Sequence, residues 1–131
     1  MVVRRIRVLI IDEHEAVRRA LATRLQRVEG IEVVGSTARW QEGVHMAVER
    51  LPDVILLEVK RSDGQGLVAL RRLRDECPLS RIVVLTSYPD PDERREALRL
   101  GAVRYLLKDI GSDHLVREIR SLAPAPIDVP R

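Results

Sequence analysis

The stretch Val54-Ile55-Leu56-Leu57-Glu58 places four consecutive apolar residues directly before a carboxylate. Three further segments repeat this arrangement, an apolar run with polar residues at its end: 8–13, 82–87 and 105–108. Short apolar runs without polar alternation are typical of strands that are buried on both faces. The four runs therefore predict strands of one parallel sheet, with polar side chains at the point where each strand ends.

Longer stretches with apolar residues at helical spacing separate these runs, and a fifth short run follows Gly30. Ser112 is a candidate N-cap of the last helix. The alternation predicts a doubly wound α/β sandwich, in which right-handed crossovers place helices on both faces of a parallel sheet. We predict strands over 6–11, 31–35, 53–57, 81–85 and 103–107, and helices over 14–28, 41–51, 67–76, 92–100 and 112–122.

The 131 residues fit one domain, which we place at 1–122, followed by a Pro-rich tail or linker stub over 123–131. There is no Phe and one Trp, so the core must consist of Val, Leu, Ile and Ala. One cysteine excludes an internal disulfide framework and fits a reducing cytosol. No apolar run approaches the ~20 residues of a membrane span, and the first residues lack a signal-peptide pattern. We therefore expect a cytoplasmic protein without a membrane partner.

The formal net charge is +3, but the arginines alternate with acids, as in Asp92-Glu93-Arg94-Arg95-Glu96. This pattern favours a solvated, salt-bridged surface over a nucleic-acid interface. Lys60 and Lys108 are the only lysines among 23 basic residues. A lysine at a strand end supplies a compact point charge, which makes Lys108 a candidate functional residue.

The carboxyl ends of parallel strands lie along one edge of a sheet, where open α/β proteins bind their ligands. The pair Asp12-Glu13, Glu58, Thr86 and Lys108 all fall at such ends, and we expect them to form one site. The first of these loops is acidic and not glycine-rich, which argues against a dinucleotide or flavin phosphate site. Clustered carboxylates are instead oxygen ligands that suit Mg²⁺.

In this order and at these intervals, the strand-end residues resemble the receiver domain of two-component response regulators, the CheY-like superfamily, over roughly residues 4–122. The resemblance implies a flavodoxin-like (βα)5 fold with a five-stranded parallel sheet in the order 2-1-3-4-5. It also implies a protein that signals through protein partners and is not an enzyme. The run Leu106-Leu107-Lys108-Asp109 is most similar to receivers of a subfamily that usually carries a helix-turn-helix output domain.

The resemblance implies a role for each of these residues. The metal ligands would be Asp12, Glu13, Glu58 and the backbone carbonyl of Lys60. A phosphoryl group would be contacted by Thr86 and Lys108. The switch residues would be Thr86 and Tyr105, and Gly66 would be the glycine that follows the third-strand loop.

Two positions depart from the family pattern. Glu58 stands where the family has the aspartate that accepts the phosphoryl group, and Ser62 stands where a proline is common. The extra methylene moves the carboxylate by about 1.5 Å, and a misplacement of that size costs on the order of 100-fold in rate. The longer side chain could also contact Lys108 or Thr86. Such a contact would partly imitate phosphorylation, and pairing with Lys108 would weaken or abolish Mg²⁺ binding.

Three interpretations of Glu58 remain open. We favour a receiver that signals without phosphorylation, through partner binding, another ligand or a fixed conformation. The second interpretation is a receiver that Glu58 holds near its active state. The third is a receiver still phosphorylated with Mg²⁺, or a catalyst of its own dephosphorylation, that uses Glu58 or a nearby acid such as Asp63. A plain salt bridge between Glu58 and Lys108 is compatible with the first two.

The expected partners are a sensor kinase or a downstream effector protein. A homodimer could form through helix 92–100, strand 103–107 and helix 112–122, or through helices 14–28 and 112–122. DNA would be contacted only through an effector domain that this chain lacks, so a stand-alone receiver and the N-terminal domain of a transcription regulator both remain open. The three histidines are interpreted as surface residues and not as ligands: His14, His45 and His114.

Overall fold

The computed structural model describes residues 4–123 and contains one five-stranded parallel sheet. The strand order is β2-β1-β3-β4-β5, which confirms the expected order and the doubly wound fold. Each strand is followed by a helix, so the chain consists of five βα units. The strands are β1 (Ile6–Ile11), β2 (Ile31–Thr37), β3 (Val54–Leu57), β4 (Arg81–Thr86) and β5 (Arg104–Leu107).

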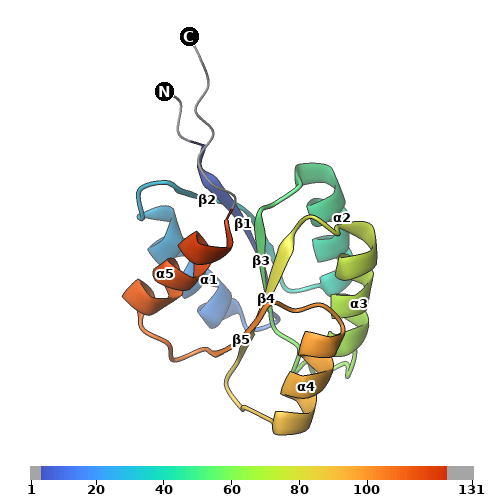
Figure 1. Ribbon diagram of the computed structural model, residues 1–131. Helices are drawn as coiled ribbons and strands as arrows, with labels where there is room; N and C mark the ends of the chain where they lie inside the picture. The colour runs from blue at the N-terminus through green and yellow to red at the C-terminus, as the bar shows by residue number, and fades with distance from the viewer. Residues whose placement is uncertain (1–3, 124–131) are drawn as a thin grey trace.

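The five helices form a layer on each face of the sheet (Figure 1). Helices α1 and α5 cover one face, and α2, α3 and α4 cover the other. This arrangement gives the three-layer sandwich that the alternation of strands and helices predicts. The helices are α1 (Glu15–Gln26), α2 (Trp40–Arg50), α3 (Gly66–Glu76), α4 (Pro91–Arg99) and α5 (Ser112–Leu122).

Alternate residues of each central strand pack into different halves of the core. In β1, Leu9 and Ile11 contact the side of α2, α3 and α4, whereas Val8 and Ile10 contact the side of α1 and α5. All four are fully buried, as a strand covered on both faces requires. Aliphatic side chains dominate both halves, and Trp40 is the buried aromatic residue among them, so the expected aliphatic core is confirmed.

Strand β2 continues to Thr37, two residues beyond the predicted end at Gly35. A glycine weakens a strand, but here it pairs with Leu9 after a register irregularity in β1. A Cβ at position 35 would lie 2.6 Å from the guanidinium of Arg50, which donates a hydrogen bond to the backbone carbonyl of Val34. Tertiary pairing therefore extends the strand through a residue that normally ends one.

Helix α5 begins at Ser112, so its N-cap is Gly111 and the expectation that Ser112 caps this helix is wrong by one residue. The Ser112 hydroxyl instead accepts a hydrogen bond of 2.9 Å from Arg24 of α1. The structure thus uses this serine to join two helices of the same layer.

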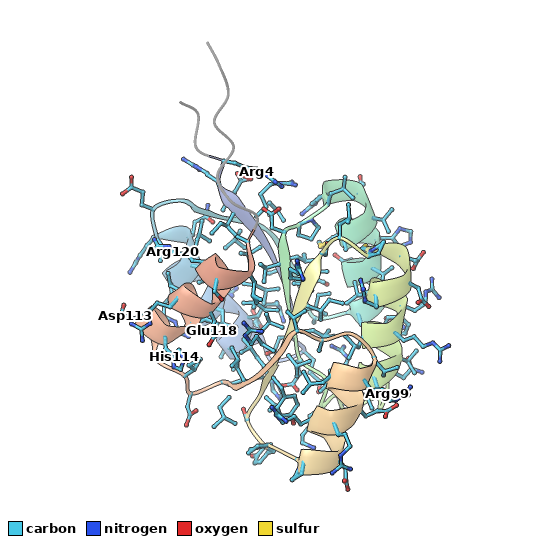
Figure 2. All side chains as sticks on the ribbon, in the orientation of Figure 1. Arg4, Arg99, Asp113, His114, Glu118 and Arg120 are labelled. Atoms are coloured by element: carbon cyan, nitrogen blue, oxygen red, sulfur yellow. The ribbon has the colours of Figure 1, made fainter. Side chains whose placement is uncertain are left out.

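The outer surface carries interleaved opposite charges. Figure 2 shows Asp113 and His114 of α5 pointing away from the body of the molecule. Arg104 of β5 pairs with Glu118 of α5 at 2.9 Å, which joins two elements of the proposed dimer surface. No helix within residues 4–123 is long and apolar enough to cross a membrane. Most of the tail, residues 124–131, lies outside the described residues.

Candidate functional site

The ends of four neighbouring strands carry the residues of the site. Asp12 follows β1, Glu58 follows β3, Thr86 ends β4 and Lys108 follows β5. Backbone hydrogen bonds continue the sheet through these positions, from Glu58 N to the Ile11 carbonyl at 2.9 Å and from Lys108 N to the Thr86 carbonyl at 2.8 Å. The sheet therefore fixes the backbone of each functional residue, as the sequence pattern predicts.

Lys108 joins the two acidic residues at the centre of the site. Its ammonium Nζ lies 2.8 Å from Oδ2 of Asp12 and forms an ion pair with Oε2 of Glu58. The three side chains are only 8%, 4% and 2% exposed in the order Lys108, Asp12, Glu58. Burial acts to lower the pKa of Lys108, but hydrogen bonds and charge from Asp12 and Glu58 outweigh it and raise that pKa above its usual value.

The second carboxylate oxygen of Glu58 is also engaged. Oε1 accepts a hydrogen bond of 2.7 Å from the backbone amide of Lys60, two residues further along the chain. Both oxygens of Glu58 thus have partners: Oε1 bonds to Lys60 in the same loop, and Oε2 pairs with Lys108, which follows β5. The longer side chain of glutamate reaches the lysine directly.

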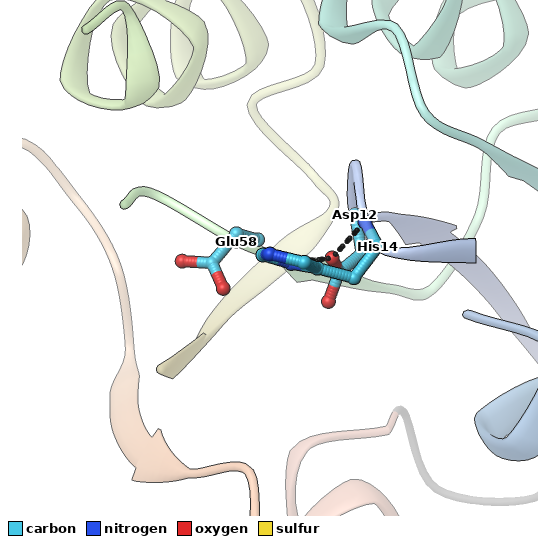
Figure 3. A group of neighbouring side chains, drawn as sticks. All are labelled: Asp12, His14 and Glu58. Carbon is cyan, nitrogen blue, oxygen red and sulfur yellow. Dashed lines mark hydrogen bonds and ion pairs between the residues drawn. The ribbon is translucent and has the colours of Figure 1, made fainter. Parts of the chain in front are cut away.

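His14 lies at the mouth of this cluster, where the sequence indicated only a surface residue. Its side chain is 57% exposed, but its ring Nδ1 lies 3.1 Å from Oδ1 of Asp12, which also accepts from the His14 backbone amide at 2.8 Å. Figure 3 shows the ring beside the carboxylates of Asp12 and Glu58. One ligand atom from each of these three residues lies within 4.8 Å of the others. The sequence feature that could have indicated this placement is that His14 follows Asp12 by only two residues.

Glu13, the second acid of the expected metal-binding pair, accepts its hydrogen bonds elsewhere. Its two carboxylate oxygens accept hydrogen bonds of 2.8 Å from the hydroxyl and from the backbone amide of Ser62. These two bonds, the hydroxyl first, lower the pKa of Glu13, with help from the charge of Arg61. Asp12 and Glu13 are adjacent in sequence but bind different parts of the structure. Asp12 pairs with Lys108, whereas Glu13 bonds to the loop between β3 and α3.

The residues present fit Mg²⁺ only in part. Mg²⁺ prefers oxygen ligands in octahedral geometry, and Asp12 and Glu58 offer such oxygens. Their charges, however, are already balanced in part by the Lys108 ammonium, and Glu13 is bonded to Ser62. A divalent ion at this place must compete with an ammonium that both carboxylates bind.

Thr86 and Tyr105, the two expected switch residues, make their hydrogen bonds away from Glu58. The fully buried Thr86 hydroxyl accepts from the backbone amide of Tyr88 at 3.1 Å. The Tyr105 hydroxyl donates to Glu93 of α4 at 2.6 Å and accepts from the backbone amide of Asp90 at 3.3 Å. Burial, and then the hydrogen bond to Glu93, raise the pKa of Tyr105 to about 12.

A doubly wound sheet with paired acids, a hydroxyl and an ammonium at the carboxyl ends of its strands defines a receiver-type domain. The sequence matches the family of response regulator receiver domains over residues 8–120. The chain therefore belongs to this family.

Relatives and solved structures agree with this assignment. The transcriptional regulatory protein LiaR of Bacillus subtilis (strain 168) is 40% identical over 116 residues, which cover 88% of this chain and 55% of LiaR. The DNA-binding transcriptional activator DevR/DosR of Mycobacterium tuberculosis is 32% identical over 117 residues, covering 89% of this chain and 54% of that protein. The response regulator domain of Thermotoga maritima CheB superposes with a TM-score of 0.81 at 28% identity, covering 91% of this chain and 96% of that domain. The chain spans about half the length of the curated relatives it matches.

Proposed function

We propose that this chain is an atypical response regulator receiver that signals without accepting a phosphoryl group and is not an enzyme. The observation that carries the proposal is the buried ion pair between Glu58 and Lys108. The carboxylate at the acceptor position and the lysine that would bind a phosphoryl group satisfy one another. Lys108 is therefore already paired with the carboxylate at the acceptor position before any phosphoryl group arrives.

Phosphoryl transfer depends on positioning and on neutralisation of the phosphoryl charge. At this site an incoming phosphoryl group must compete with Glu58 for the Lys108 ammonium, which the buried ion pair already engages. The attacking oxygen is also displaced by about 1.5 Å relative to an aspartate. Both effects act against phosphorylation, and they act together.

Mg²⁺ binding is weak or absent in the same proposal. The ammonium of Lys108 contacts both Asp12 and Glu58, and Glu13 is bonded to Ser62. A divalent ion that prefers oxygen ligands then meets two carboxylates whose charge a lysine already neutralises in part. Replacement of Glu58 by aspartate shortens the acid and frees Lys108 from this contact.

The two alternatives have less support. In a receiver held near its active state, Glu58 would replace the phosphoryl oxygens toward both Lys108 and Thr86, but the Thr86 hydroxyl donates to the backbone carbonyl of Tyr88 at 3.3 Å. Asp63, the nearby acid considered as another acceptor, accepts a hydrogen bond of 2.9 Å from the Gln65 amide in the loop before α3. That bond places Asp63 at the turn into the helix, outside the Lys108 cluster.

The intact mass of the chain after incubation with Mg²⁺ and a small acyl-phosphate donor tests the proposal. We expect no added phosphoryl group on the native chain and one on Glu58→Asp, with Glu58→Gln as a matched control that lacks a carboxylate. A phosphoryl group on the native chain would overturn the proposal, and mapping the modified residue would identify the working acceptor. No gain by Glu58→Asp would show that the pocket is disabled by more than this residue.

We also propose that the chain is the N-terminal receiver of a longer DNA-binding transcription regulator that acts in the cytoplasm. The supporting observation is that it matches about half of relatives such as LiaR and DevR/DosR, which are described as transcription regulators. The partners would be a sensor kinase or the protein's own effector domain, and dimers would form through α4-β5-α5 or α1-α5.

The downstream reading frame of the gene tests whether the chain continues into a DNA-binding domain. A helix-turn-helix segment there supports the proposal, and a stop codon after Arg131 contradicts it.

A further inference from the structure

Lys60 connects the acceptor position to helix α4. Its backbone amide donates to Oε1 of Glu58 at 2.7 Å. Its side chain extends in another direction, where Nζ lies 3.1 Å from Oε2 of Glu93 and 3.9 Å from a carboxylate oxygen of Asp90. A single residue of the loop after β3 thus contacts both the site and the start of α4.

Glu93 uses its two oxygens for two different elements. Oε2 pairs with Lys60, while Oε1 accepts the Tyr105 hydroxyl of β5 at 2.6 Å. Asp90 fixes the same region, since its carboxylate caps α4 by accepting the amides of Asp92 and Glu93 and its own amide donates to Tyr105. The first turn of α4 is therefore the place where the loop after β3 and strand β5 meet.

Tyr105 is also part of an exposed surface. Together with Pro91, Leu98 and Leu107 it lines a groove of about 690 Å³ between α4 and β5. Arg94 and Arg95 add positive charge to the same groove. A change in the position of the Tyr105 ring would reshape this surface.

We propose that Glu93 couples the loop after β3 to Tyr105, so that displacement of Lys60 by a partner or a substitution changes the α4-β5 groove. This coupling rests on the proposed function only in that it gives an unphosphorylated receiver a route from its site to its surface. It uses neither Thr86 nor a phosphoryl group. Lys60 and Tyr105 are linked because both bind the carboxylate of Glu93, whose side chain is mostly buried. Without the Lys60 ammonium, the hydrogen bond from Tyr105 becomes the main partner of that charge.

An isolated surface ion pair contributes little to stability, so a Lys60–Glu93 pair without further consequence is the competing explanation. The two explanations differ at Tyr105, which shares no hydrogen bond with Lys60 among the described residues. If the pair is merely peripheral, removal of the Lys60 charge leaves the tyrosine unaffected. If Glu93 couples Lys60 to Tyr105, removal of the Lys60 charge changes the environment of the Tyr105 ring.

NMR of the full chain with isotope-labelled tyrosine rings tests the coupling. The chain has two tyrosines, and Tyr88, which is 73% exposed, serves as an internal reference. We expect Lys60→Met, which keeps the apolar stem, and Glu93→Gln to shift the Tyr105 ring signals. Arg99→Met removes an exposed charge on the same helix that pairs only with Glu96 among the described residues and does not line the groove, and it should shift neither tyrosine. Unchanged Tyr105 signals in folded Lys60→Met would overturn the proposal.

A double-mutant cycle gives an independent measurement. Lys60→Met and Tyr105→Phe are made singly and together, and the folding equilibrium constant of each is measured by urea unfolding. We expect the combined effect to differ by about threefold or more from the product of the single effects, because residues of one network are not additive. Equality with that product would overturn the coupling. Neither experiment involves phosphorylation, so a phosphorylated native chain would refute the proposed function without deciding this point.

Discussion

Glu13 accepts two hydrogen bonds from Ser62, one from the hydroxyl and one from the backbone amide, each 2.8 Å long. The two residues lie 49 positions apart, so this contact joins the loop after β1 to the loop after β3. Ser62 stands where the resemblance leads one to expect a proline, which has no amide hydrogen to donate. The serine therefore permits a connection that a proline at the same position would lose.

The Glu13 contact should make a small, acid-sensitive contribution to stability. The pKa of Glu13 in the folded chain lies below its usual 4.5, so the contribution is complete above that pH and disappears as pH falls through the folded value. We expect Glu13→Gln to lower the free energy of unfolding by less than about 1 kcal/mol near neutral pH. Urea unfolding at neutral and acidic pH checks this. Glu15→Gln, which removes an exposed acid paired with Arg19, is the control. A difference from native that does not shrink in acid would contradict the assignment.

Gly66 is required by the close approach of two backbone segments. A Cβ at this position would lie 1.7 Å from the carbonyl oxygen of Val59, and backbone atoms cannot move aside as a side chain can. We expect Gly66→Ala to destabilise the fold by about 1–3 kcal/mol or more. Gly111→Ala is the control, because no atom lies within 4 Å of its Cβ; since Gly111 is the N-cap of α5, the alanine should cost less than about 1 kcal/mol there. Equal melting temperatures for the two variants would refute this explanation.

The placement of the site residues at one edge of the sheet could be predicted because each follows a continuous apolar run. Asp12, Glu58 and Lys108 lie directly after β1, β3 and β5. A parallel sheet places the carboxyl ends of its strands along one edge, independent of the loop conformations. The possible contact between Glu58 and Lys108 followed from the site that the resemblance implies together with the greater length of a glutamate side chain. The resemblance supplied the strand order itself, which the apolar pattern does not determine.

The direction of each loop side chain could not be predicted in the same way. Glu13 bonds to Ser62, and Lys60 pairs with Glu93, 33 residues away, because of how two loops and a helix start lie relative to one another. His14 likewise adjoins Lys108, 94 residues away. Apolar periodicity carries no information about such contacts, since the residues involved are polar and lie outside the strands.

Tyr105 should titrate well above an ordinary phenol. Burial and Glu93 raise its pKa from the usual 10.0 to about 12, so the neutral phenol is favoured in the folded chain. Its contribution to stability is therefore complete below pH 10.0 and is lost as pH rises toward about 12. Ultraviolet titration in a Tyr88→Phe background isolates Tyr105, and circular dichroism shows whether the chain is still folded. We expect Glu93→Gln to lower the midpoint, and a midpoint near 10.0 in the folded Tyr88→Phe chain would contradict the burial of this hydroxyl.

Lys108 should contribute more to stability than any other charged residue of the site. Lys108→Met leaves the buried carboxylates of Asp12 and Glu58 without their shared cation, and breaking a buried pair in this way costs about 3–5 kcal/mol. Glu58→Gln should cost less, because Lys108 keeps Asp12 and the Gln carbonyl can still accept from the Lys60 amide. Since the pKa of Lys108 is raised above 10.5, its contribution is complete below that pH and is lost as pH rises through the folded value. Urea unfolding of the two variants and the native chain, at neutral and strongly alkaline pH, measures both effects. If Lys108→Met unfolds no more easily than Glu58→Gln, the ammonium does not hold the two acids together.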